Sequence, residues 1–275
     1  MNIIGIIMNN QIENAEPVAE EIRAYLANRG RSCYVSETGE DLPISCECAL
    51  VLGGDGTLLR AAKVVLDRQL PLFGINLGTL GYLAEIGTED IIPSLDRILD
   101  GEFSIEKRMM LSGTIIRDGK PVLSDTALNE ISLSRLKQLR AYCIKNYVNG
   151  VLLSTYSADG MIISTATGST GYNLSVGGPI VSPEAELIVM TPHAAHSLIS
   201  RSIVLPGSDE VCVEIGEGRS GFTEEVVSAW FDGDNRMNLS TGDCIAIRKE
   251  KRYTNIIKIS HLSFVEILRR KMSQA

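Results

Sequence analysis

The chain has 275 residues, 44% of them hydrophobic, with a formal net charge of −8 and a pI of about 5.1. This length allows two domains or one large one, and the acidic balance argues against binding nucleic acid or anionic membranes through a broad basic surface. No apolar run reaches the roughly 18 residues that span a bilayer, and the N-terminus lacks the basic segment of a secretion signal. We therefore expect a cytoplasmic protein without nucleic-acid or membrane partners.

Six cysteines are scattered along the chain, and without a secretion signal we expect them to be reduced thiols. Only Cys46 and Cys48 are close in sequence, and their spacing lacks the second pair that a zinc site would need. His193 and His196 are near each other, but no third ligand is evident. The sequence therefore predicts no metal ligands.

Strand-like and helix-like segments alternate in the N-terminal part of the chain. Apolar runs predict strands, and helical periodicity predicts helices. The strands are predicted at 2–8, 32–35, 48–52 and 71–76, and the helices at 14–29, 58–66 and 88–99. This alternation is typical of an α/β domain with a parallel sheet, whose ligands bind beyond the carboxyl ends of the strands. We therefore expect the loops at 53–57 and 76–82 to lie at one edge of that sheet.

Beyond Gly101 the helical periodicity disappears, and short runs rich in Ile, Val, Thr and Tyr alternate with turn signals. Three dipeptides are of the kind favoured in tight hairpins: Asp118-Gly119, Asn149-Gly150 and Asp232-Gly233. We therefore predict an α/β domain over residues 1–104 and an all-β domain over 105–258. Residues 259–275 are predicted to be a helical segment that returns to the first domain.

The sequence Gly53-Gly54-Asp55-Gly56-Thr57 lies between a predicted strand and a predicted helix. Glycines there let a ligand approach the backbone, and the N–H groups of a helix N-terminus suit phosphate. The loop is neither a Walker A motif nor a dinucleotide fingerprint. Asp55 would repel phosphate unless it binds a bridging metal ion or accepts the proton of a hydroxyl that attacks a phosphoryl group. The alternative is a tight turn in which Asp55 caps a helix at Thr57.

Two further motifs stand in the predicted β domain. The amide of Asn129 can pair with a base edge, and the carboxylate of Glu130 can accept hydrogen bonds from a ribose diol. The alternative is that these two residues form an ordinary turn at the edge of a sheet. The segment from Ser164 to Gly171 contains only Ser, Thr, Ala and Gly, so we expect it to expose hydroxyl and N–H groups to a ligand. Tyr172 follows directly and could stack on a ring.

With these motifs in this order, the chain resembles the bacterial NAD kinases over nearly its whole length. The glycine loop alone is shared with lipid kinases of the diacylglycerol type, but the later motifs are specific. The resemblance rests on Gly53-Gly54-Asp55-Gly56-Thr57, Asn129-Glu130, Asp159-Gly160, Thr167-Gly168-Ser169-Thr170-Gly171-Tyr172, Leu174-Ser175, Gly177-Gly178-Pro179-Ile180 and His196-Ser197-Leu198. The family commonly has proline at Ala166 and alanine at Gly171, and the stretch from Thr191 to His196 is also unusual.

The resemblance implies transfer of the γ-phosphate of ATP, with Mg²⁺, to the adenosine 2′-hydroxyl of NAD. It implies NAD between an α/β and an all-β domain, and a homodimer or homotetramer formed through the β domains. A non-catalytic NAD or NADP sensor and a lipid kinase are the alternatives.

The resemblance also implies roles for individual residues. Asp55 is the implied catalytic carboxylate. Tyr82, Asn129 and Thr170 would surround the adenine. Glu130 and Tyr172 would hold the nicotinamide riboside half, and Asp159 would reach the carboxamide of the same or a neighbouring subunit's ligand. Further contacts with NAD or ATP are expected from Gly54, Gly56, Thr57, Arg60, Arg140, Ser164, Thr167, Gly171, Ser175 and Asp234.

Overall fold

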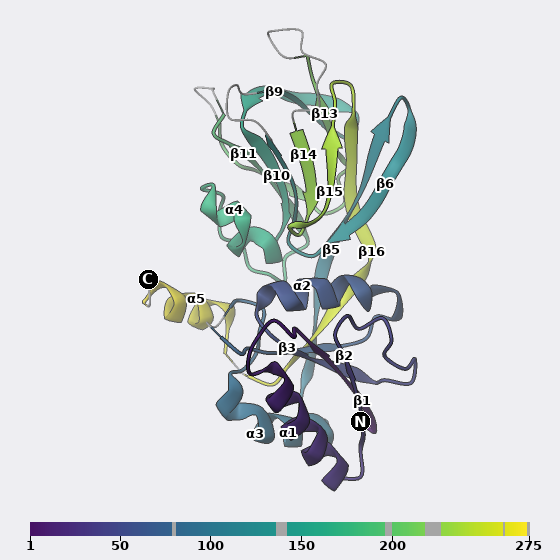
Figure 1. Cartoon of the computed structure of the whole chain (residues 1–275). Helices are drawn as coiled ribbons and strands as arrows, with labels where there is room; N and C mark the ends of the chain where they lie inside the picture. Colours follow the sequence, from purple (N-terminus) through teal and green to yellow (C-terminus); the bar gives the residue numbers. More distant parts are fainter. Residues whose placement is uncertain (79–80, 136–141, 196–199, 218–226, 261, 274–275) are drawn as a thin grey trace. The chain divides into compact units, whose positions relative to one another are not determined.

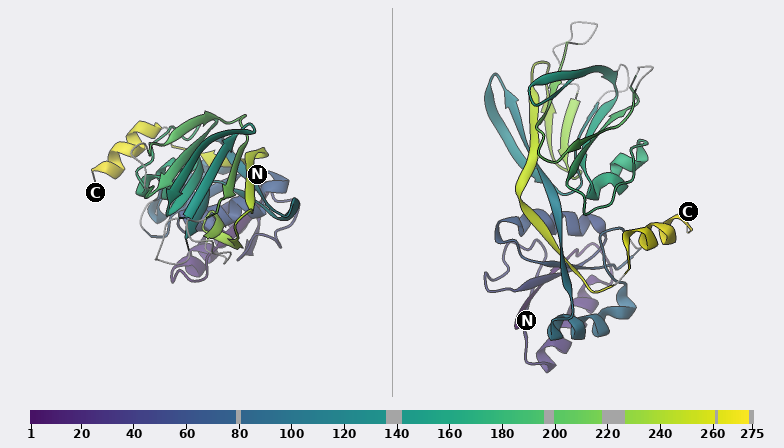
Figure 2. Two further views of the ribbon diagram at one scale, coloured as in Figure 1. Left: turned by 90° about the horizontal axis from the view of Figure 1, so that it is seen from above. Right: turned by 180° about the vertical axis from the view of Figure 1, so that it is seen from behind.

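The computed structural model describes the chain except residues 79–80, 136–141, 196–199, 218–226, 261 and 274–275 (Figure 1). It divides into two compact units, one formed by residues 1–108 and 252–275 and the other by 109–251. Two long strands, β5 (Ser104–Arg117) and β16 (Cys244–Lys258), have residues in both units, and Figure 2 shows them from two further sides. The predicted domain limits at 104 and 258 remain predictions.

The first unit is built on a parallel sheet in the order β2-β1-β3-β4, and the end of β16 pairs in parallel with β4 through Ile256 and Leu72. These strands are β1 (Ile3–Met8), β2 (Ser32–Ser36), β3 (Cys48–Leu52) and β4 (Leu72–Ile75). Every residue of β3 and β4 is buried, which explains their unbroken apolar sequence. The predicted α/β architecture with a parallel sheet is confirmed.

Helices cover both faces of this sheet (Figure 1). On one face, the buried sides of α1 and α3 share a hydrophobic cluster with the strands. On the other face lies α2, whose Leu58 side chain fills the space beside Gly74. These helices are α1 (Ala15–Asn28), α2 (Asp55–Val64) and α3 (Ile91–Asp100), with short 3₁₀ turns at Leu66–Arg68 and Thr88–Asp90.

The second unit contains an antiparallel six-stranded sheet in the order β12-β11-β10-β7-β14-β15. Its strands are β7 (Glu130–Arg135), β10 (Gly160–Thr165), β11 (Leu187–His193), β12 (Ile203–Pro206), β14 (Val227–Phe231) and β15 (Asp234–Leu239). A further antiparallel set comprises parts of β5 and β16 with β6 (Lys120–Ala127), β8 (Tyr142–Val148), β9 (Val151–Ala158) and β13 (Val211–Ile215).

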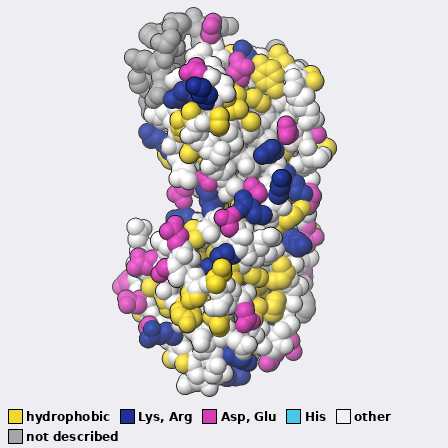
Figure 3. Space-filling model, turned by 90° about the vertical axis from the view of Figure 1, so that its right-hand side faces the viewer, with side chains coloured by type: hydrophobic (Ala, Val, Ile, Leu, Met, Phe, Trp, Pro, Cys, Tyr) yellow, Lys and Arg dark blue, Asp and Glu magenta, His cyan; other side chains and the backbone are white. Residues whose placement is uncertain are grey.

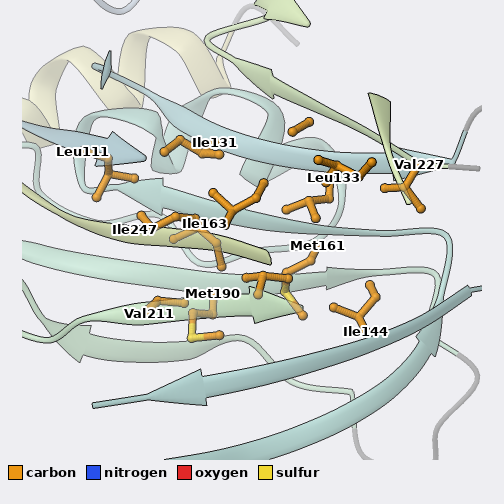
Figure 4. Packing of buried hydrophobic residues seen from close by; sticks show 14 of the residues in the cluster. Leu111, Ile131, Leu133, Ile144, Met161, Ile163, Met190, Val211, Val227 and Ile247 are labelled. Atoms are coloured by element: carbon orange, nitrogen blue, oxygen red, sulfur yellow. The ribbon is translucent and has the colours of Figure 1, made fainter. Parts of the chain in front are cut away.

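The strands of the second unit enclose one large buried apolar cluster. Figure 4 shows Ile131, Ile163, Met190 and other members of this cluster pointing toward one another from different strands. The alternating burial along β8 and β13 shows that each strand turns one side to this core and the other away from it.

The three predicted hairpins are confirmed, because each dipeptide joins two paired antiparallel strands. Both residues of each dipeptide have positive φ, at 51° and 72° for Asp118-Gly119, for example. The twist of such turns matches that of the strands they connect, and Asp, Asn and Gly tolerate the conformation.

Two short helical turns within residues 105–258 were not expected. They are a 3₁₀ turn at Thr167–Thr170 and α4 (Tyr172–Ser175). Segments this short contain too few turns to give a periodic apolar pattern. The predicted C-terminal helix exists as α5 (Phe264–Met272), which begins with a capping box between Ser263 and Glu266. Over the described part of the chain, no helix has both the length and the apolarity required to cross a membrane.

Candidate active site

The glycine loop leads directly into α2, which begins at Asp55 with Gly54 as its N-cap residue. The helix starts earlier than predicted because the Thr57 N–H already bonds to the Gly54 carbonyl at 3.0 Å. No side chain caps this helix. The alternative in which Asp55 caps a helix at Thr57 is therefore wrong, and its carboxylate is directed elsewhere.

The Asp55 carboxylate binds the loop that follows β4. Its Oδ2 accepts from the Tyr82 N–H at 2.8 Å, and its Oδ1 accepts from the Leu83 N–H at 3.1 Å. Gly81 makes this approach possible, since a Cβ there would lie 1.9 Å from Oδ1. The two loops predicted to share an edge of the sheet are thus joined through Asp55. Each carboxylate oxygen keeps a further lone pair for another donor.

The backbone beside Asp55 is open. Apart from the two chain neighbours and the backbone of the same helix, no described atom lies within 4 Å of the position that a Cβ would take on Gly54 or Gly56. Gly53 instead packs tightly, because a Cβ there would lie 2.3 Å from Thr57 Oγ1, and the Thr57 side chain is buried. The loop therefore combines a fixed anchor with open backbone at a helix N-terminus, an arrangement that suits phosphate.

Basic side chains near this loop come from two helices. Arg60 is exposed on α2. Lys271 of α5 holds its Nζ 5.3 Å from the centre of the Tyr82 ring, and Tyr82 is the residue whose N–H binds Asp55. Lys271 is not among the site residues predicted from the sequence, because only the fold brings the C-terminal helix to this loop.

In the second unit, the turn that carries Asn129 and Glu130 is organised by Asp232. The Asp232 carboxylate accepts from the N–H groups of Leu128, Asn129 and Glu130 at 2.7, 2.8 and 3.1 Å. From the sequence, Asp232 is predicted only as a hairpin residue and not as part of the site. A carboxylate that accepts several backbone N–H bonds fixes the local backbone strongly.

The segment of small residues is bound to the same turn. Thr165 Oγ1 donates to the Leu128 carbonyl at 2.6 Å, and the Thr165 N–H donates to the Asn129 carbonyl at 2.8 Å. Gly168 packs against the turn so closely that a Cβ would lie 2.2 Å from the Asn129 carbonyl oxygen. Ser164 and Thr167 are buried. We expected exposed hydroxyls, but small side chains are needed here because two backbone segments are in contact.

Asn129 and Glu130 are neighbours in sequence, yet their side chains converge. The position of a Cβ on Gly171 would be 3.2 Å from both Asn129 Nδ2 and Glu130 Oε2. This is possible because Glu130 is the first residue of β7 and Asn129 precedes the strand. Asn129 Oδ1 and Glu130 Oε2 are buried without a hydrogen-bond partner among the described residues. Such atoms are costly when they stay unpaired, so each calls for a partner such as an ordered water or a ligand.

Burial raises the pKa of Glu130 to about 8. The negative charge of Asp232 adds to this increase, whereas a hydrogen bond from the Tyr172 backbone N–H opposes it. Below that pH the carboxyl group is mainly neutral, and it can donate as well as accept a hydrogen bond.

The raised pKa of Glu130 predicts a dependence of stability on pH. The ordinary pKa of 4.5 applies in the unfolded chain, so the folded protein retains an extra proton between about 4.5 and 8. The free energy of unfolding should therefore fall as the pH rises through this window. Glu130→Gln removes the titrating group. As the pH rises, the free energy of unfolding of this variant should therefore increase relative to that of the parent by on the order of a few kcal/mol. Urea unfolding at pH 5 and pH 9 measures this, and a pH-independent difference between the two proteins would contradict it.

Asp159 and Tyr172 both have close partners that the sequence does not predict. Asp159 Oδ2 forms an ion pair with Arg135 at 2.9 Å. The Tyr172 hydroxyl lies 3.5 Å from His193 Nδ1, and the two rings meet edge to face with their centroids 6.0 Å apart. Tyr172 is 38% exposed, so part of its side chain is accessible to a ligand.

The remaining predicted site residues differ in their surroundings. Thr170 Oγ1 donates to the Thr167 carbonyl at 3.3 Å. Ser175 and Asp234 are exposed. Arg140 and the His196-Ser197-Leu198 motif lie outside the described residues.

Within the described residues, no group of three or more His, Cys, Asp or Glu side chains is arranged to hold a metal ion. On the face shown in Figure 3, Lys and Arg side chains are interspersed with Asp and Glu. An anionic ligand on that face would depend on a local arrangement of donors.

Residues 36–103 match the family model of the ATP-NAD kinase N-terminal domain, and residues 128–259 match that of the ATP-NAD kinase C-terminal domain. The chain belongs to the NAD kinase family. Members of this family phosphorylate NAD to NADP with ATP, and the predicted enzyme class is confirmed. An NAD kinase of Lachnospira eligens is 38% identical over 97% of this chain and 98% of its own. One of Geobacter sulfurreducens is 37% identical over 99% and 98%.

Solved structures share the fold of this NAD kinase family member. A yeast NADH kinase, solved with NADH, has a TM-score of 0.89 at 22% identity and covers 99% of this chain and 88% of its own. An NAD kinase from Archaeoglobus fulgidus, solved with ATP, has a TM-score of 0.81 at 22% identity and covers 99% of both chains. The predicted fold class is confirmed.

Proposed function

We propose that Asp55 accepts or orients the proton of the adenosine 2′-hydroxyl of NAD while that oxygen attacks the γ-phosphorus of ATP. A bond forms between the 2′-oxygen and phosphorus, and the bond from phosphorus to the β,γ-bridging oxygen breaks, leaving NADP and ADP. The observation that carries this assignment is the Asp55 carboxylate, which is fixed by two backbone N–H groups beside open glycine backbone. Alignment and charge neutralisation would supply most of the rate.

We assign the phosphates to the glycine loop, with Gly54, Gly56 and Thr57 at the helix N-terminus and Arg60 one turn further along α2. Mg²⁺ would enter bound to ATP. The dipole and free N–H groups of α2 favour negative charge at this end.

We assign NAD recognition to the turn at Asn129 and to its neighbours. Asn129, Thr170 and Tyr82 would surround the adenine, Glu130 and Tyr172 would hold the nicotinamide riboside half, and Asp159 would reach the carboxamide. The unpartnered oxygens of Asn129 and Glu130 support this assignment. The other proposed contacts are Arg140, Ser164, Thr167, Gly171, Ser175 and Asp234. Self-association through the β domain into a homodimer or homotetramer is part of the proposal.

The purified protein should form NADP when incubated with ATP, Mg²⁺ and NAD, measured with a cycling enzyme specific for NADP. Parallel reactions with polyphosphate as donor, and with NADH or diacylglycerol as acceptor, define the substrates. Absence of NADP with intact NAD binding would favour the sensor alternative, and phosphorylation of diacylglycerol alone would favour the lipid-kinase alternative.

The role of Glu130 in NAD binding can be measured directly. Glu130→Ala removes a buried group whose Oε2 is free for the ligand, so the binding free energy should fall by about 1–3 kcal/mol, or roughly one to two decades in affinity. Isothermal titration calorimetry with NAD provides the measurement. Unchanged affinity in a correctly folded variant would show that Glu130 does not bind NAD.

A further inference from the structure

Tyr142, the first residue of β8, has a hydroxyl group that the proposed function does not use. The residue is only 6% exposed, and its ring belongs to the buried cluster of the second unit. Its phenol oxygen is buried and has no hydrogen-bond partner among the described residues. A buried hydroxyl without a partner destabilises a folded protein. If only the ring were needed for packing, phenylalanine would serve better.

Tyr142 lies, by strand register, beside a residue assigned to NAD. In the β8–β9 pair, Tyr142 is opposite Ala158, which directly precedes Asp159. Burial raises the pKa of the phenol, and the charges of Asp159 and Tyr172 raise it further.

Both neighbours already have other partners. Asp159 is paired with Arg135, and the Tyr172 hydroxyl contacts His193. The Tyr142 hydroxyl is therefore a buried donor for which no described residue supplies an acceptor.

We propose that the Tyr142 hydroxyl donates a hydrogen bond to the carboxamide oxygen of the nicotinamide of NAD. This rests on the proposed function, which assigns Asp159 and Tyr172 to that half of the ligand. A carboxamide presents an NH₂ donor and a carbonyl acceptor side by side. A carboxylate can only accept, whereas a phenol can donate, so Asp159 and Tyr142 together complement both ends of the amide.

Tyr142→Phe tests the proposal because it removes only the hydroxyl. By calorimetry, the affinity for NAD should fall about 3- to 10-fold, as expected for the loss of one neutral hydrogen bond. The affinity for ADP-ribose, which lacks the nicotinamide, should stay at the parent value. The melting temperature of the unliganded variant should equal or exceed that of the parent, since the hydroxyl has no hydrogen bond to a described residue to lose. Tyr156→Phe is the matched control, because Tyr156 is 9% exposed in the same cluster and its hydroxyl is not among the buried unpartnered atoms.

Three results would overturn the proposal. The first is an affinity of Tyr142→Phe for NAD equal to that of Tyr156→Phe. The second is an equal loss of affinity for NAD and for ADP-ribose. The third is a lowered melting temperature with unchanged NAD binding. Failure of the proposed function is distinguishable from these results, because the parent protein would then form no NADP. Calorimetry of Tyr142→Phe reports on the hydroxyl in either case.

Discussion

Asp55→Asn should lower the turnover number about 10²–10⁴-fold while NAD still binds, because the amide cannot take the proton of the 2′-hydroxyl. The substitution also has a structural cost. The Tyr82 and Leu83 N–H groups each donate to one carboxylate oxygen of Asp55. The asparagine side chain has one oxygen, which can accept from one of these N–H groups, but its NH₂ group would face the other and cannot accept. We therefore expect a loss of about 1–3 kcal/mol in the free energy of unfolding as well. Steady-state kinetics and urea unfolding measure the two effects separately.

Two glycine variants distinguish the charge of Asp55 from its position. Gly81→Ala keeps the carboxylate but would place a Cβ 1.9 Å from Oδ1, so the carboxylate must move. Displacement of a reacting group by about 1 Å can cost on the order of 10²-fold in rate. Gly78→Ala is the matched control in the same loop, because no described atom beyond its chain neighbours lies within 4 Å of its Cβ position. Turnover of Asp55→Asn within about threefold of the parent would eliminate Asp55 as the catalytic carboxylate.

Asp232→Ala should weaken NAD binding and destabilise the second unit together. The substitution removes the acceptor for three backbone N–H groups, those of Leu128, Asn129 and Glu130. Each N–H left without a partner costs about 1–3 kcal/mol when buried, so we expect a total loss of roughly 2–4 kcal/mol after partial hydration. Because Asn129 and Glu130 lose their fixed backbone, the affinity for NAD should fall at least about tenfold.

Asp118→Ala is the matched control for this variant. Asp118 occupies the same position in another Asp-Gly hairpin, with φ of 51° against 54° for Asp232, and it is exposed. Alanine therefore carries the same left-handed backbone strain at both positions, and only the Asp232 variant loses the three hydrogen bonds. Similar stability and similar NAD affinity in the two variants would show that the Asp232 carboxylate does not organise the turn.

Features encoded by neighbouring residues were predictable from the sequence alone. The apolar run of β3, the amphipathic pattern of α1 and the three hairpin dipeptides each specify their structure locally. The glycine loop and the later motifs indicated the family and the reaction because their residue types and order are specific. In these cases the physical determinant, a periodicity or a positive φ, lies within a few residues.

Only the tertiary structure decided how the site is held in place. Asp232 is separated by 102 to 104 residues from the N–H groups it binds, and Asp55 by 27 and 28 from its donors. The small residues around Gly168 looked like a ligand surface, but they are small because another backbone segment passes within contact distance. The hydroxyl of Tyr142 gave no sequence signal at all. Contacts between distant segments leave no local periodicity, so their partners became visible only when the folded chain brought them together.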